Sequence, residues 1–201
     1  MTDQTPVVVQ AVRTPQGKED GVYADTRSED FSVPLINEML AETGLDSEAV
    51  DDLLWGCAQQ RDEQGNNVAR VIALMSDLGE SVPATTINRW CASSAEAIMR
   101  GADAIAAGQR DCVIAGGMES MSRVKMDANT HNVHPRLAQM YNIGELSMGM
   151  TAEKVAEEHG VSREAQDEYA LRSHERAAEA TESGRFEGDV TVNDKGFMLE
   201  G

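Results

Sequence analysis

Three cysteines, at positions 57, 91 and 112, are the side chains of this sequence best suited to nucleophilic chemistry. Cys91 lies between a predicted strand end at residues 85–88 and the first turn of an alanine-rich segment with helical spacing. At a helix start, unpaired backbone N–H groups and the positive end of the helix dipole favour the thiolate, which is the nucleophilic form. The carboxyl ends of parallel strands are also where ligand sites form. Position alone leaves a reactive Cys91 and an inert one equally open.

The other two cysteines are expected to be structural. Cys57 follows Trp55 inside an apolar run, and Cys112 opens another such run. Three cysteines cannot all pair within the chain, and no C-x-x-C or Cys/His ligand spacing occurs. The sequence therefore predicts neither a disulfide framework nor a metal site.

Apolar runs and helical spacings alternate in the part of the chain that surrounds Cys91. This alternation predicts an α/β layer in the order βαβαβαβ, with a largely parallel sheet and right-handed crossovers. The polar stretch 16–30 is expected to be a loop. The predicted strands are 7–12, 53–57, 85–87 and 112–115, and the predicted helices are 35–40 (ending at Gly44), 68–75 (ending near Gly79) and 91–107.

Beyond Gly117 the composition changes. Residues 118–150 are rich in Met, Asn, His and Ser without clear periodicity, which is typical of a long excursion over a site. A helix is predicted over 151–159, and a second one begins after Ser162, a candidate N-cap, and runs towards Gly184. In the final stretch, valines at 190 and 192 alternate with polar residues. We expect two domains, 1–117 and 118–201.

The charge is strongly acidic, with 35 Asp and Glu against 17 Lys and Arg and a formal net charge of −18. Such a field repels polyanions, so nucleic-acid binding is not expected. This net charge fits either a merely acidic protein or a protein adapted to a cytoplasm of very high salt. The second interpretation is favoured because salt screens the repulsion among the protein's own carboxylates. No apolar run approaches the roughly 18 residues that a membrane span needs, and residues 1–6 are polar and lack the basic and apolar regions typical of a signal peptide. A cytoplasmic location without a membrane span is the expectation.

Five segments of the chain resemble signatures of the thiolase family, and they occur in the same order as in that family. The Asn-Arg-x-Cys run that ends at Cys91 is similar to the nucleophile segment of thiolases. The segment 55–60, with His134-Pro135 and Ser173-His174, most resembles the thiolases of fatty-acid β-oxidation. The five segments are Val12–Pro15, Trp55–Gln60 (with 63–65 and 67–70), Asn88–Ala95, Gly116–Ser122 and Met148–Glu153 (followed by Ser162–Asp167).

This resemblance implies a thiolase-like layered fold, in which two similar α/β halves form five layers and a helical loop domain is inserted in the first half. The present chain would supply that first half and the loop domain. The resemblance further implies that acyl-CoA and CoA bind as substrates, without a separate cofactor. It also implies a homodimer or homotetramer for the complete enzyme.

The mechanism implied by the resemblance is acyl transfer through Cys91. Its thiolate would attack a 3-oxoacyl-CoA and expel acetyl-CoA, and CoA would then take the acyl group; the reverse is a Claisen condensation. Met148 matches a family residue near the reacting thioester. Ser147 occupies the position where some biosynthetic thiolases carry a histidine that contacts CoA, which fits the degradative group. In the family, the activating histidine and a second cysteine come from the second half, so this chain alone is expected to be inactive.

Three alternatives remain beside a β-oxidation thiolase. A related ketosynthase is disfavoured by the segments 116–122 and 148–153. A biosynthetic acetoacetyl-CoA thiolase, or a non-catalytic half-thiolase acting as an interaction subunit, stays open. Two positions depart from the family pattern, Ala92 and Glu96, and both could alter the surroundings of the thiol. Histidines 131, 134, 159 and 174 do not lie in the family's catalytic histidine motif and are expected to be surface or structural residues.

Overall fold

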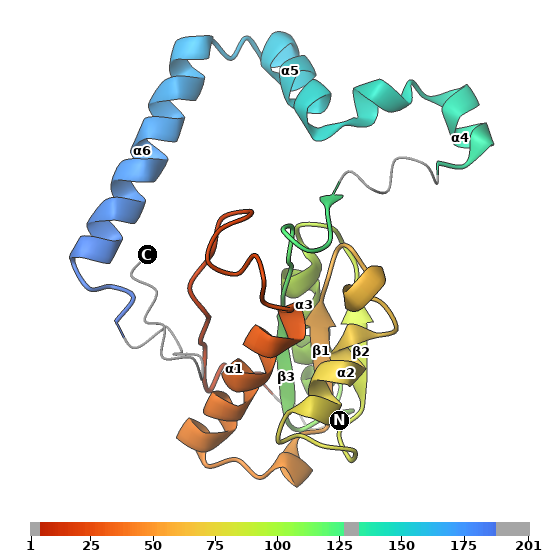
Figure 1. Cartoon of the computed structure of the whole chain (residues 1–201), viewed down its shortest axis with the longest axis vertical. Coiled ribbons are helices and arrows are strands. Elements are labelled where there is room, and N and C mark those ends of the chain that lie inside the picture. Colours follow the sequence, from red (N-terminus) through yellow and green to blue (C-terminus); the bar gives the residue numbers. More distant parts are fainter. Residues whose placement is uncertain (1–4, 127–132, 188–201) are drawn as a thin grey trace. The chain divides into compact units, whose positions relative to one another are not determined.

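The computed structural model describes residues 5–126 and 133–187, which belong to two compact units (Figure 1). The first unit extends to Met126 and the second runs from Asp127 to Glu187. The division therefore falls later than the sequence-based boundary after Gly117. Met118 and Val124 are buried in the first unit, so the segment that follows the last strand packs with the sheet.

A three-stranded parallel sheet forms the centre of the first unit. Its strands are β1 (Asp52–Gly56), β2 (Ala84–Ile87) and β3 (Val113–Gly117), in the order β2-β1-β3. Leu53 is in register with Ala84 on one side and with Ile114 on the other. Because all three strands run the same way, their carboxyl ends meet at one edge of the sheet, and the predicted α/β class is confirmed.

The two faces of the sheet bury alternate residues of β1, as a strand's period of two requires. Leu53 and Trp55 belong to the larger core cluster, with residues of α1 (Ser28–Thr43) and α2 (Val68–Met75). Leu54 belongs to a smaller cluster with Ala97 of α3 (Ser93–Ala106). The sheet thus has α1 and α2 on one face and α3 on the other.

The end of α1 agrees with the sequence-based prediction, whereas its start does not. α1 ends where Gly44 adopts φ +66°, a left-handed conformation that glycine reaches without steric cost. Its start at Ser28 is earlier than expected, so the predicted loop over 16–30 ends at residue 27. Two short 3₁₀ turns, η1 (Ser47–Ala49) and η2 (Asp62–Gln64), complete the connections.

One expectation for the first unit is wrong. The run 7–12 is not a buried strand: Val7, Val8 and Val9 are 74–81% exposed and belong to no named strand. Only Val12, at the end of the run, packs against the core cluster, and within the described residues the run belongs to no named strand of the sheet. The alanine-rich helix α3 is half covered, since Ala97 is buried against the sheet while Ile98 and Met99 are about half exposed.

The second unit is helical, with α4 (Pro135–Met140), the turn η4 (Ile143–Leu146), α5 (Met148–His159) and α6 (Arg163–Glu182). The predicted N-cap is confirmed, since Ser162 Oγ accepts a hydrogen bond from the Ala165 N–H at 3.2 Å. No residue in these four elements is buried. His131 and the valines at 190 and 192 lie outside the described residues. Within 5–126 and 133–187, no helix has the length and apolar character needed to cross a membrane.

Candidate active site

Cys91 stands on a tight turn between the end of β2 and the start of α3. The residue before it, Trp90, has a backbone φ of +50°, which is uncommon for residues other than glycine, asparagine and aspartate. Such a conformation costs on the order of 1–3 kcal/mol and persists only where the surrounding structure enforces it. A strained strand-to-helix turn that presents a nucleophile is a recurring arrangement in acyl-transfer enzymes.

Neighbouring polar groups enforce this turn. Ser93 Oγ accepts a hydrogen bond from the Arg89 N–H at 2.8 Å and donates one to the Trp90 carbonyl at 2.6 Å. Asn88 Oδ1 accepts from the Trp90 N–H at 2.9 Å. The strained residue therefore has both its backbone N–H and its carbonyl fixed by side chains within the same short motif.

The thiol of Cys91 is exposed and precedes the helix by two residues. α3 begins at Ser93, with Ala92 as its cap, so the predicted helix start at residue 91 is two residues too early and Cys91 lies just before the first turn. The helix has 14 residues, and the positive end of its dipole faces this turn. A thiol at such a place is accessible to a substrate.

Glu96, one of the two departures from the family pattern, lies in the first turn of α3 with its side chain 9% exposed. Its carboxylate forms ion pairs with Arg89 Nε at 3.2 Å and Arg100 Nε at 2.8 Å. Two guanidinium groups thus compensate the acidic charge that this sequence carries near the Cys91 turn.

Glycines at two strand ends let α3 approach the sheet closely. A Cβ on Gly56 would lie 2.5 Å from the Ser94 nitrogen and 2.6 Å from the Ser93 carbonyl carbon. A Cβ on Gly117 would clash with Ser94 Oγ of α3 and would lie 2.6 Å from the Gly56 carbonyl oxygen. Real Cβ atoms do not come this close to backbone, so the seating of the helix start, and with it the Cys91 turn, requires glycine here.

The other two cysteines are poorly suited to nucleophilic attack. Cys57 is 1% exposed, and burial, with a smaller contribution from the Glu119 carboxylate, raises its pKa to about 12. Cys112 is partly buried, and burial followed by the charge of Asp51 raises its pKa as well. Within the described ranges, no group of three or more His, Cys, Asp or Glu side chains is arranged to hold a metal ion.

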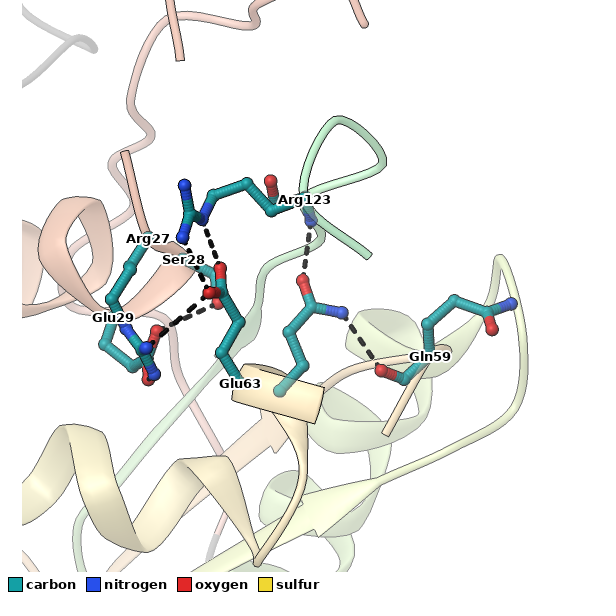
Figure 2. A network of polar contacts seen from close by, with 8 residues as sticks. Arg27, Ser28, Glu29, Gln59, Glu63 and Arg123 are labelled. Atoms are coloured by element: carbon teal, nitrogen blue, oxygen red, sulfur yellow. Dashed lines mark hydrogen bonds and ion pairs between the residues drawn. The ribbon is translucent and has the colours of Figure 1, made fainter. Parts of the chain in front are cut away.

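A charged network ties the start of α1 and the turn η2 to the segment that follows β3 (Figure 2). Arg123 contacts Glu63 through two parallel bonds, Nε to Oε1 at 2.6 Å and Nη2 to Oε2 at 2.9 Å. Arg27 pairs with Glu29 at 2.6 Å and with Glu63 at 3.5 Å. The hydrogen bond from Arg123 lowers the pKa of Glu63 below its ordinary 4.5, so this pairing stabilises the fold at neutral pH and is lost as the pH falls through the lowered pKa.

The predicted substrate-binding residues lie in the second unit. Ser147 caps α5, its Oγ accepting from the Met150 N–H at 3.4 Å, and Met148 is the first residue of that helix with 78% of its surface exposed. His134 caps α4 through a hydrogen bond from the Arg136 N–H, which is a structural role. For Ser147 and Met148, contact with substrate stays a prediction.

Comparison with known proteins gives a consistent picture. A family model described as the thiolase N-terminal domain matches residues 6–197. The 3-ketoacyl-CoA thiolase of Pseudoalteromonas translucida (strain TAC 125) is 45% identical over 187 residues, which cover 92% of this chain and 48% of that protein. The 3-ketoacyl-CoA thiolase of Escherichia coli O1:K1 / APEC is 43% identical over 188 residues, with the same coverage.

Among solved structures, the acetyl-CoA acetyltransferase of Bacillus anthracis matches with a TM-score of 0.82 and 33% identity, over 96% of this chain and 52% of that one. The chain spans about half the length of the curated relatives it matches. The match over nearly all of its residues, with the strand–turn–helix geometry around Cys91, shows that the chain belongs to the thiolase family.

Proposed function

We propose that this chain provides the nucleophile of an acetyl-CoA C-acyltransferase that cleaves 3-oxoacyl-CoA with CoA. The observation that supports this most directly is the exposed Cys91 thiol on a strained turn before α3, in a chain similar to proteins named 3-ketoacyl-CoA thiolase. The Cys91 thiolate attacks the C3 carbonyl, the C2–C3 bond breaks, and acetyl-CoA leaves as an enolate that takes a proton at C2. The thiolate of CoA then attacks the acyl-cysteine thioester, which releases acyl-CoA and restores Cys91.

Other parts of the reaction need further groups. The backbone N–H of Cys91 is proposed to help stabilise the developing oxyanion, since it belongs to the residue that carries the attacking sulfur. Ser147 and Met148 are proposed to contact the acyl-CoA. The general base and the proton donor for C2 are expected from the second half of the thiolase fold. The complete enzyme is proposed to be a cytoplasmic homodimer or homotetramer that acts in fatty-acid β-oxidation.

A biosynthetic acetoacetyl-CoA thiolase is the second candidate. The similarity to the acetyl-CoA acetyltransferase of Bacillus anthracis supports this second candidate, because that protein is 33% identical to this chain. The higher identity of 41–45% to proteins named 3-ketoacyl-CoA thiolase favours the degradative activity. Comparing turnover of acetoacetyl-CoA with that of longer 3-oxoacyl-CoA substrates separates the two.

Acyl transfer to Cys91 is the direct test of the proposal. We expect the chain, supplemented with a separately produced carboxyl-terminal half of a thiolase, to release acetyl-CoA from acetoacetyl-CoA and CoA. Acid quenching without CoA should trap an acetyl group on the Cys91 peptide, found by mass spectrometry. Cys91→Ser should lower turnover by about 10⁴-fold or more, because a serine hydroxyl is a far weaker nucleophile at neutral pH.

The matched control is Cys112→Ser, which should keep the activity. An acyl group found on another residue, with none on Cys91, would refute the assignment. Turnover by the chain alone would show that the base lies among its own residues. The absence of any acyl-enzyme in the supplemented sample would favour the non-catalytic half-thiolase.

The acidic charge supports adaptation to high salt. With a net charge of −18, self-repulsion should destabilise the fold at low ionic strength. The screening length falls from about 10 Å at 0.1 M salt to about 3 Å at 1 M. We expect thermal unfolding in molar potassium chloride at a clearly higher temperature than in dilute buffer. A melting temperature that is equal or higher in dilute buffer would leave the acidic surface without this explanation.

A further inference from the structure

Glu119, which follows β3, makes contacts that join the carboxyl ends of two strands. Its Oε2 accepts a hydrogen bond from the Ala58 N–H at 2.7 Å, and its Oε1 accepts from the Gln59 N–H at 3.3 Å. Oε1 also accepts from Gln64 Nε2 at 2.6 Å. One carboxylate therefore holds the loop that leaves β1.

Gln64 makes this arrangement rigid. Its side chain is fully buried, donates to the Gln59 carbonyl at 3.0 Å, and accepts from the Ser120 N–H at 2.8 Å. Figure 2 shows Gln59 within this set of contacts. Because Gln64 binds both the Glu119 carboxylate and the backbone next to Glu119, the orientation of that carboxylate is fixed from two sides.

A continuous path of hydrogen bonds leads from Glu119 to the nucleophile turn. Ala58 donates its backbone N–H to the Glu119 carboxylate, and its carbonyl oxygen accepts a hydrogen bond from Asn88 Nδ2 at 2.9 Å. The same Asn88 carboxamide accepts from the Trp90 N–H at 2.9 Å. Trp90 is the residue with φ +50° immediately before Cys91. The ends of β1, β2 and β3 are thus joined at the turn that presents the thiol.

We propose that Glu119 is a positioning residue for Cys91, acting through Ala58 and Asn88 to hold the strained Trp90 turn. Its role in catalysis rests on the proposed function, in which Cys91 is the nucleophile of acyl transfer. The turn conformation is unfavourable by itself, so it needs fixed partners. A carboxylate is suited to this position because both of its oxygens only accept, and three N–H donors converge on them. A glutamine would place an NH₂ group against at least one of these donors and lose hydrogen bonds whichever way its amide is turned.

The test measures how fast iodoacetamide labels Cys91 in the 201-residue chain, with labelled peptides quantified by mass spectrometry. We expect Glu119→Gln to lower the Cys91 rate by about tenfold, because the thiol loses its alignment with the start of α3. Glu63→Gln is the matched control. It removes a neighbouring carboxylate with its ion pairs to Arg123 and Arg27, yet should leave the Cys91 rate unchanged.

A double-mutant cycle separates positioning through Asn88 from a general loss of stability. Asn88→Ala should reproduce the slowing, and Glu119→Gln added to it should slow Cys91 little further, because both changes break one path. Asn88→Ala also serves as the independent variant if Glu119→Gln does not fold. A Cys91 rate equal to that of the unmodified chain in Glu119→Gln, or fully multiplicative effects in the double variant, would overturn the proposal. The failure of acyl-enzyme trapping would refute the proposed function instead, since alkylation does not depend on it.

Discussion

Brief alkylation of the folded chain should label Cys91 at least about 10³-fold faster than Cys57. The reason is the contrast between an exposed thiol before a helix and a thiol that is 1% exposed with its pKa raised to about 12. At pH 8, a pKa near 12 leaves about one Cys57 thiol in ten thousand as the reactive thiolate. Cys112, partly buried and also with a raised pKa, should react at an intermediate rate.

The measurement is a time course with limiting iodoacetamide at pH 8, followed by digestion and mass spectrometry of the three cysteine peptides. Repeating it in denaturant is the internal control, because unfolding removes the burial and should bring the three rates close together. Preferential labelling of Cys57 in the folded chain would contradict both the site and the geometry described for it.

The parts of the fold that depend on local pattern were predictable. The core strands follow from short apolar runs and the helices beside them from helical apolar spacing, and Gly44 and Ser162 have the residue types that helix ends require. The run 7–12 has an equally good strand pattern, but whether such a run is buried depends on what covers it. That information lies in tertiary contacts and not in the run itself.

The candidate site shows the same limit. Cys91 was identifiable because the Asn-Arg-x-Cys run that ends there resembles the nucleophile segment of thiolases, whereas its place between a strand end and a helix start left the question open. The left-handed Trp90 was not, because tryptophan carries no preference for that conformation. The contacts of Glu119 were also hidden, since its partners Ala58, Gln59 and Gln64 lie 55–61 positions away along the chain. Their only trace in the sequence was that all of them fall in segments resembling thiolase signatures.

Gly56→Ala should destabilise the first unit by about 1–3 kcal/mol and slow the labelling of Cys91. The added Cβ would meet the Ser94 nitrogen at 2.5 Å and the Ser93 carbonyl carbon at 2.6 Å. Both are backbone atoms, which cannot move aside as a flexible side chain can. The start of α3 must therefore shift away from the end of β1, and the turn that carries Cys91 must shift with it.

Gly149→Ala is the control for this change, because a Cβ there has no atom within 4 Å and the position lies in α5. Alanine favours a helix over glycine by up to about 1 kcal/mol, so this variant should be neutral or slightly stabilising and should leave Cys91 labelling unchanged. Gly101→Ala, whose Cβ would contact a Val113 methyl at 3.2 Å, should lie between the two, since a side chain can yield. Chemical denaturation gives the stabilities and the iodoacetamide time course gives the reactivities. If Gly56→Ala behaved like Gly149→Ala in both measurements, the close seating of α3 on the strand ends would not be what fixes the position of Cys91.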